Sequence, residues 1–263
     1  MSVTVAKKMF KGSNRYTMAN DLRLWVVSQI PELKLVKSVT TGNYPWWLYK
    51  FGDTDYGMSF DWYNNYDYLR ASFFRGITDA SVANNGDYTF STSTVVENGN
   101  TLYANGAIVV KTPHGYIIQG VNYAGAPYES FIYFGTVNSA INGEIVVGGI
   151  FSSAAYVYSR TDKAGYQELS SGSGFYFKIN KETPAVWRHG ALTAICPSGT
   201  AHAPAGLFVA SAVYGVTGTI WTDPIRIDAF YALAGSVFPP YYTEVTAGGH
   251  KMQRIGKSLL LEG

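Results

Sequence analysis

Residues that carry chemistry are scarce in this chain. It has one cysteine and four histidines, against 21 tyrosines, 14 phenylalanines and six tryptophans. Histidine and cysteine supply many of the nucleophiles, general bases and metal ligands of proteins, whereas aromatic side chains supply area for cores and interfaces. The imbalance indicates a protein whose aromatic residues fill a core and form contacts with other protein chains. We therefore expect neither an enzyme nor a bound cofactor.

Thiol and metal chemistry have little support. Cys196 is the single cysteine, so no disulfide can form within the chain. It stands seven residues after His189 and six before His202, which matches no common pair of zinc ligands. Asp53 and Asp55 resemble the opening of a calcium loop, but an asparagine occupies the position of that loop's bidentate glutamate. Calcium binding at these two carboxylates stays open.

Charge is sparse as well. Charged residues make up 14% of the chain, and its formal net charge is +2. Nucleic-acid binding needs clustered basic residues, so no nucleic-acid partner is expected. Two small basic clusters lie near the ends: Lys7, Lys8 and Lys11, and His250, Lys251, Arg254 and Lys257. A surface with so few charged residues is typical of one that is covered by a partner protein or by other copies of the same chain.

Long apolar runs are absent too. No stretch approaches the ~18 apolar residues that a membrane helix needs, so no membrane partner is expected. The basic residues Lys7 and Lys8 are also not followed by the apolar stretch of a secretory signal peptide. These two absences predict a chain that is made in the cytoplasm.

One helix is expected near the start. Apolar residues recur at helical spacing, and they are Leu22, Trp25, Val26, Ile30 and Leu33. Thr17 or Asn20 can cap the helix, and Pro31 ends or kinks it. The simplest interpretation is an amphipathic helix that packs on a sheet. The alternative is that the stripe from Leu22 to Ile30 docks onto a neighbouring subunit.

After residue 39 almost everything predicts strands and turns. The strands are aromatic or β-branched runs such as 46–51, 68–74, 107–111 and 130–134. Asn-Gly pairs at 85, 98, 105 and 142 predict tight turns, because both residues tolerate positive φ. Short strands without helices between them are typical of antiparallel sandwiches and barrels. The expected fold is therefore mostly β: an antiparallel β-sandwich or barrel-like domain with one N-terminal amphipathic helix.

The domain organisation is expected to be simple. No linker rich in proline, serine or charge divides the chain. We predict an N-terminal arm and helix over 1–39 and an antiparallel β domain over 40–263, together one continuous unit. Residues 241–262 predict a hairpin that turns at Gly248-Gly249 and is followed by a short apolar strand. That end is expected to be tied into a sheet or an interface.

Aromatic residues are densest between positions 46 and 68. The cluster comprises Trp46, Trp47, Tyr49, Trp62, Tyr63, Tyr66 and Tyr68. Such rings can fill a core and a subunit interface, or they can stack on sugars. We favour packing and interface. Rings that gather on an exposed face around Asp and Asn donors would instead favour a carbohydrate-binding module.

Three features together resemble virion structural proteins of tailed bacteriophages. They are the helix at 20–30, the β body rich in glycine and tyrosine, and the closing segment 248–261 with its glycine turn, basic-aliphatic strand and short last strand. The resemblance implies a structural component of a tail, baseplate or neck ring, made in the bacterial cytoplasm and located in the virion. It implies a symmetric homo-oligomer with copies of itself and other virion proteins as partners. The alternatives are a carbohydrate-binding or receptor-contacting module of a tail, and a capsid decoration protein.

Overall fold

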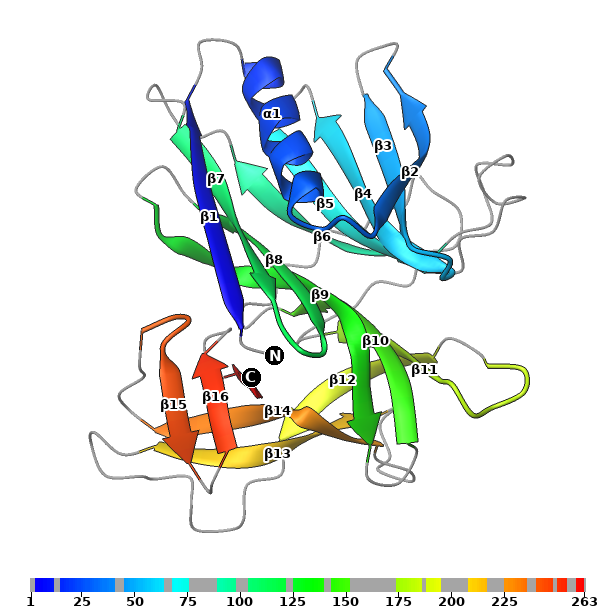
Figure 1. Cartoon of the computed structure of the whole chain (residues 1–263), viewed down its shortest axis with the longest axis vertical. Coiled ribbons are helices and arrows are strands. Elements are labelled where there is room, and N and C mark those ends of the chain that lie inside the picture. Colours follow the sequence, from blue (N-terminus) through cyan, green and yellow to red (C-terminus); the bar gives the residue numbers. More distant parts are fainter. Residues whose placement is uncertain are drawn as a thin grey trace.

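The computed structural model describes residues 3–11, 15–40, 45–63, 68–75, 89–97, 104–121, 125–139, 143–151, 174–185, 188–194, 208–216, 225–235, 240–247, 250–254 and 259–262. Within these ranges the chain is mostly β, with one helix and with antiparallel pairing between all neighbouring strands (Figure 1). This confirms the fold class that the sequence predicts. No helix in this part of the chain is long and apolar enough to cross a membrane.

Twelve described strands form the larger sheet, in the order β1-β7-β8-β9-β10-β11-β12-β13-β14-β17-β16-β15. Their bounds are β1 Thr4–Lys11, β7 Ala104–Lys111, β8 Gly115–Val121, β9 Pro127–Ser139, β10 Gly143–Phe151, β11 Gly174–Ile179, β12 Arg188–Ala194, β13 Phe208–Val216, β14 Ile225–Gly235, β17 Leu259–Glu262, β16 His250–Arg254 and β15 Glu244–Ala247. The smaller sheet has five described strands: β2 Leu33–Val39, β3 Trp46–Phe51, β4 Tyr56–Tyr63, β5 Tyr68–Arg75 and β6 Thr89–Glu97. Neither sheet closes on itself among these strands.

The helix α1 spans Arg15–Ser28 and begins earlier than expected. Thr17 and Asn20 lie inside it, so the prediction that either residue caps it is wrong. It ends before Pro31, as predicted, because the residue before a proline disfavours helical dihedrals. Ile30 and Leu33 lie beyond the helix, yet both are buried. A turn closed by the hydrogen bond from Leu33 N–H to Ile30 O (3.0 Å) keeps the apolar stripe on one core.

Two strands within the first 39 residues were not predicted. β1 pairs with β7 along its whole length, and β2 pairs with β3 across a register shift between Leu35 and Lys37. In Figure 1 the helix lies between these two strands. The N-terminal residues therefore contribute an edge strand to each sheet as well as the helix.

The Asn-Gly pairs have different outcomes. Gly143 opens β10 with φ 70°, directly after the β9–β10 turn, as predicted. Asn105 and Gly106 instead lie inside β7, so the predicted turn there is wrong. A Cβ atom at Gly106 would lie 2.2 Å from Lys8 O, which shows that close approach of β1 explains the glycine. The pairs at 85 and 98 lie outside the described residues.

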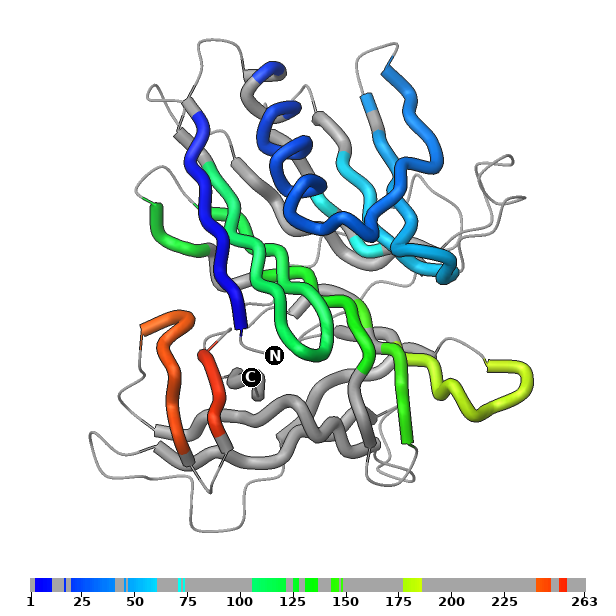
Figure 2. Tube along the Cα trace, in the orientation of Figure 1, coloured from blue at the N-terminus to red at the C-terminus, as the bar shows by residue number. Residues whose placement is uncertain are grey.

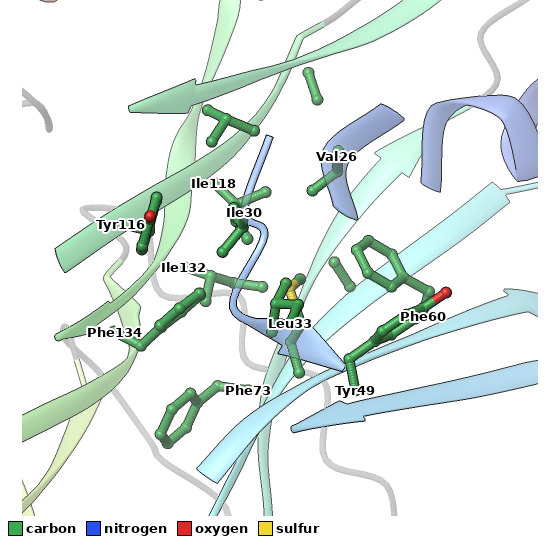
Figure 3. Close-up of a cluster of buried hydrophobic side chains, with 14 of the residues drawn as sticks. Val26, Ile30, Leu33, Tyr49, Phe60, Phe73, Tyr116, Ile118, Ile132 and Phe134 are labelled. Atoms are coloured by element: carbon green, nitrogen blue, oxygen red, sulfur yellow. The ribbon is translucent and has the colours of Figure 1, made fainter. Parts of the chain in front are cut away.

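The first core lies between α1 and the two sheets (Figure 3). Leu22 and Val26 of α1 meet residues of β3, β4 and β5 on one side and of β7, β8 and β9 on the other. An aromatic group belongs to this core or packs against it, with neighbouring ring centroids 5.2 to 6.4 Å apart: Phe51, Tyr56, Phe73, Tyr116 and Phe134. This core joins both sheets and the helix into one unit.

Strands β7 to β9 are buried on both faces. Along β8, Tyr116 and Ile118 belong to the first core, while the alternating Ile117 and Gln119 are also fully buried. Successive side chains of a strand point to opposite faces, so a second buried layer lies behind these strands. This explains why they are nearly continuous apolar runs, a pattern of strands that are covered on both sides. We call β7–β9 the shared wall.

The C-terminal segment packs on the second face of this wall. β15 and β16 pair on either side of residues 248–249, and β17 pairs with both β16 and β14, which confirms the predicted hairpin and final strand. Tyr242 Oη donates a hydrogen bond to the buried Gln119 Oε1 of β8. Tyr242 has φ 61°, and its N–H donates to Arg254 O at 2.8 Å. A side-chain hydrogen bond therefore fixes the segment to the wall, and the main-chain hydrogen bond joins two parts of the segment itself.

Candidate functional site

The aromatic cluster at 46–68 is divided by the structure. Trp47 and Tyr49 are 5% and 4% exposed and belong to the first core, which agrees with the favoured interpretation of packing and leaves these two rings no contact with a neighbour or a glycan. Trp46 lies in β3, Trp62 and Tyr63 in β4, and Tyr68 in β5, but their side chains are not described. Tyr66 lies outside the described residues. What the structure describes of this cluster is core.

A buried arginine accounts for these two rings. Arg23 of α1 is 6% exposed, and its guanidinium carbon lies 4.3 Å from the centroid of the Trp47 ring. Its Nη1 donates to Tyr49 Oη, while Nε and Nη2 donate to Asn20 Oδ1 at 3.3 and 2.7 Å. Burial raises the pKa of the Tyr49 phenol, and the positive charge of Arg23 opposes that shift. These contacts fix the helix to β3.

Sequence reasoning missed Arg23. The available signal was its position beside the apolar stripe, three residues after Asn20, where the two side chains can meet on a helix surface. The planar guanidinium suits this place because it can stack on an indole and donate several hydrogen bonds at once. The cluster binds α1 to the chain itself, and all of its described members serve packing.

The inward side of α1 belongs to the chain's own core. Leu22, Val26 and Ile30 are at most 2% exposed, which confirms the simpler prediction of a helix on a sheet. The alternative, in which these three residues dock onto a neighbour, is wrong. Trp25 is partly buried and packs edge-on against Phe10 of β1, with centroids 6.1 Å apart.

The outward side of the same segment is different. The exposed large apolar side chains of the described residues are Val5 (43%), Leu24 (49%), Leu35 (54%) and Val39 (38%), and all four lie between residues 5 and 39. Lys7, Lys8 and Lys34 are exposed beside them. We call this set, on β1, α1 and β2, the N-terminal surface. It has more than one side, because Leu35 pairs with the core-facing Tyr49 whereas Val39 pairs with Trp46 on the opposite face of β3. Figure 2 shows the three elements in blue, next to one another.

Two sheet edges belong to this surface. Among the described strands, β1 pairs only with β7 and β2 pairs only with β3, so each presents one unpaired edge. Lysines on edge strands hinder indiscriminate strand pairing, and the register shift in β2 has a similar effect. The N-terminal surface therefore includes two strand edges that carry lysines.

Asp53 and Asp55 are each paired with a lysine. Asp53 Oδ1 lies 3.7 Å from Lys34 Nζ and is fully exposed, while Asp55 Oδ1 lies 2.7 Å from Lys178 Nζ of β11. Lysine partners from different strands compete with a bound cation. In the described part of the chain, no group of three or more His, Cys, Asp or Glu side chains could hold a metal. This arrangement does not favour the calcium site that the sequence left open.

Among the described residues, the structure does not bring together the three residues considered for thiol chemistry, Cys196, His189 and His202. Cys196 and His202 lie outside the described residues, and His189 is paired with Tyr176 in the β11–β12 ladder.

No family model matches the chain, and no curated protein or solved structure matches it either. The roles of its residues are therefore inferred from its own contacts.

Proposed function

We propose that this chain is a structural component of a tailed-phage virion. It assembles with copies of itself and with other virion proteins into a tail, baseplate or neck ring, and it acts by forming contacts and not by catalysis. The proposal joins the resemblance seen in the sequence to the surface found on the folded chain.

One observation carries the proposal: the exposed large apolar side chains of the described residues all lie on the N-terminal segment, between residues 5 and 39. Leu24, Leu35 and Val39 are apolar residues left accessible on a segment whose inward side is tightly packed. Apolar positions that the fold itself does not bury are typical of a surface that another protein covers. Two unpaired edges on the same segment add main-chain donors and acceptors.

The carbohydrate-binding alternative has less support. Trp47 and Tyr49 lie in the core, so they cannot stack on a sugar. A capsid decoration protein would use the same kind of apolar contact surface. Locating this chain within a purified particle would distinguish that alternative from a tail, baseplate or neck component.

Light scattering during size exclusion tests the assembly. Over a range of concentrations we expect a defined multimer, or a molar mass that rises with concentration. A monomer at every concentration would contradict self-assembly.

Particle composition tests the location. Mass spectrometry of phage particles purified from the host should find the chain in a fixed ratio to the other particle proteins. Its loss during particle purification, while it stays abundant in the lysate, would contradict a virion role.

A further inference from the structure

We infer that β2 binds an extended segment of another protein chain, which adds to the smaller sheet as a further strand. This partner segment carries apolar side chains on the face towards α1 and acidic side chains on the other face. The inference rests on the proposed assembly function and specifies the chemistry of one partner. It follows from the edge of β2, from the exposed apolar residues on its two faces and from the charges beside it.

The edge of β2 supplies main-chain groups for such a partner. Among the described strands β2 pairs only with β3, so no described strand meets its other edge. An extended segment binds an edge of this kind through main-chain hydrogen bonds, and its alternate side chains provide the selectivity. The register shift between Leu35 and Lys37 interrupts the edge, so it favours a short partner segment over a long one.

Exposed apolar residues on both faces of β2 favour a strand as the occupant. Leu35 is exposed on the face towards α1, because it pairs with the core residue Tyr49, whereas Val39 is exposed on the opposite face, where it pairs with Trp46. A flat partner surface can cover one face of an edge strand. An added strand lies beside the edge and places side chains next to both faces.

Charge determines what the partner carries on the face away from α1. Lys34 of β2 lies directly opposite Lys50 of β3 on this face, and like charges in that position are unfavourable. Asp53 Oδ1 lies 3.7 Å from Lys34 Nζ, and in the described part of the chain no carboxylate forms an ion pair with Lys50. One carboxylate thus accompanies two lysines. An acidic side chain on the added strand, beside Lys34, would supply a second one.

The same charges act against β2 of a second copy as the occupant. Two β2 strands that paired with each other would bring two basic edges together, and like charges in an interface are costly. An acidic strand meets no such repulsion. Its binding is expected to weaken as salt is added, because exposed charges are screened.

A fluorescence-anisotropy titration with labelled peptides tests the chemistry of the partner. The probe Thr-Val-Glu-Val-Glu-Val-Thr places valines on one face of a strand and glutamates on the other. We expect it to bind about tenfold more tightly than the same peptide with lysines in place of the glutamates, and than a form methylated on alternate main-chain nitrogens. Absence of binding by the glutamate peptide, or equal binding of it and either control peptide, would overturn the inference.

Three variants test the residues that face the partner. Lys34→Glu should reverse the charge preference, so that the lysine peptide binds more tightly than the glutamate peptide. Leu35→Asp should weaken binding of the glutamate peptide, whereas the matched control Leu24→Asp, at an exposed apolar position of α1, should leave it unchanged. An unaltered preference in the Lys34 variant, or equal losses in the two leucine variants, would overturn the inference.

Hydrogen–deuterium exchange locates the bound peptide. Amides of residues 33–39 should gain protection, and protection of residues 4–11 in their place would overturn the inference. A wild-type protein that assembles but binds no glutamate peptide would contradict this inference alone. A wild-type protein that binds the glutamate peptide but stays monomeric would support it and contradict the proposed self-assembly.

Discussion

The two ends of the chain pack on opposite faces of the shared wall, but their outer sides differ. The C-terminal hairpin has the ordinary distribution: Val245 and Met252 are buried, while Glu244 and Lys251 are exposed and form an ion pair at 3.3 Å. The N-terminal segment buries Leu22 and Val26 just as completely, yet it also leaves the large apolar residues Leu24, Leu35 and Val39 exposed. These exposed residues of the N-terminal segment are the basis of the proposed contact with another protein chain.

The sharpest test of this difference uses two leucines of one helix. Leu22→Ala should cost about 3 kcal/mol of unfolding free energy, because it leaves a cavity in the first core. Leu24→Ala, two residues away and half exposed, should change it by less than about 0.5 kcal/mol. Urea denaturation measures both. Equal losses would show that the outer side of α1 is packed against the fold.

The larger sheet can be overpacked at one glycine of β10, next to the first core. A Cβ at Gly148 of β10 would lie 2.2 Å from Cζ of Phe73 in β5. Gly148→Ala should therefore cost about 2 kcal/mol, since the buried ring has to shift. The double variant with Phe73→Leu provides the control. If its two costs simply add, the clash with that ring is not the cause.

The C-terminal end should be less sensitive to removal of one hydrogen bond. Tyr242→Phe removes the donor to the buried Gln119 Oε1, and we expect a loss of about 1 kcal/mol. Thr246→Ala, at an exposed position of the same hairpin, should cost much less. A Tyr242→Phe protein as stable as wild type would show that this contact does not hold the hairpin on β8.

High pH should gradually lower the free energy of unfolding, through tyrosines that contact each end of the chain. Burial, with a hydrogen bond to the Glu32 carboxylate, raises the pKa of Tyr116 from 10.0 to about 12, and burial also raises the pKa of Tyr242. The neutral phenols are favoured in the folded chain, so their contribution to stability is complete below pH 10. It is lost as the pH rises through the folded pKa values. Denaturation between about pH 9 and pH 12 should show this decline, and Tyr116→Phe should make it shallower. An identical decline in that variant would contradict the shift at Tyr116.

Sequence reasoning recovered the helix, the β class and the closing hairpin, because each leaves a local signal. The stripe through Leu22 and Val26 has helical spacing, and Gly248-Gly249 separates two strand-like runs. β1 was missed because its lysines interrupt the apolar alternation that indicates a strand. They do so because β1 is an edge.

The candidate site was harder to predict, because period-two alternation shows that a strand has two faces but not which face the core covers. For Trp47 and Tyr49 the sequence therefore left core and interface together, and the structure places both rings in the core beneath the helix. Glycine is favoured both where φ is positive, as in a turn, and where another strand approaches closely. The sequence alone does not distinguish these two roles, so Gly106 was interpreted as a turn residue.

Hydrogen–deuterium exchange of the protein at low and high concentration tests the central claim most directly. If the outer side of the N-terminal segment is the contact surface, amides of β1 and β2 should become more protected as the chain assembles, since both present unpaired edges in the single chain. Assembly without any gain of protection in residues 4–11 and 33–39 would contradict the claim.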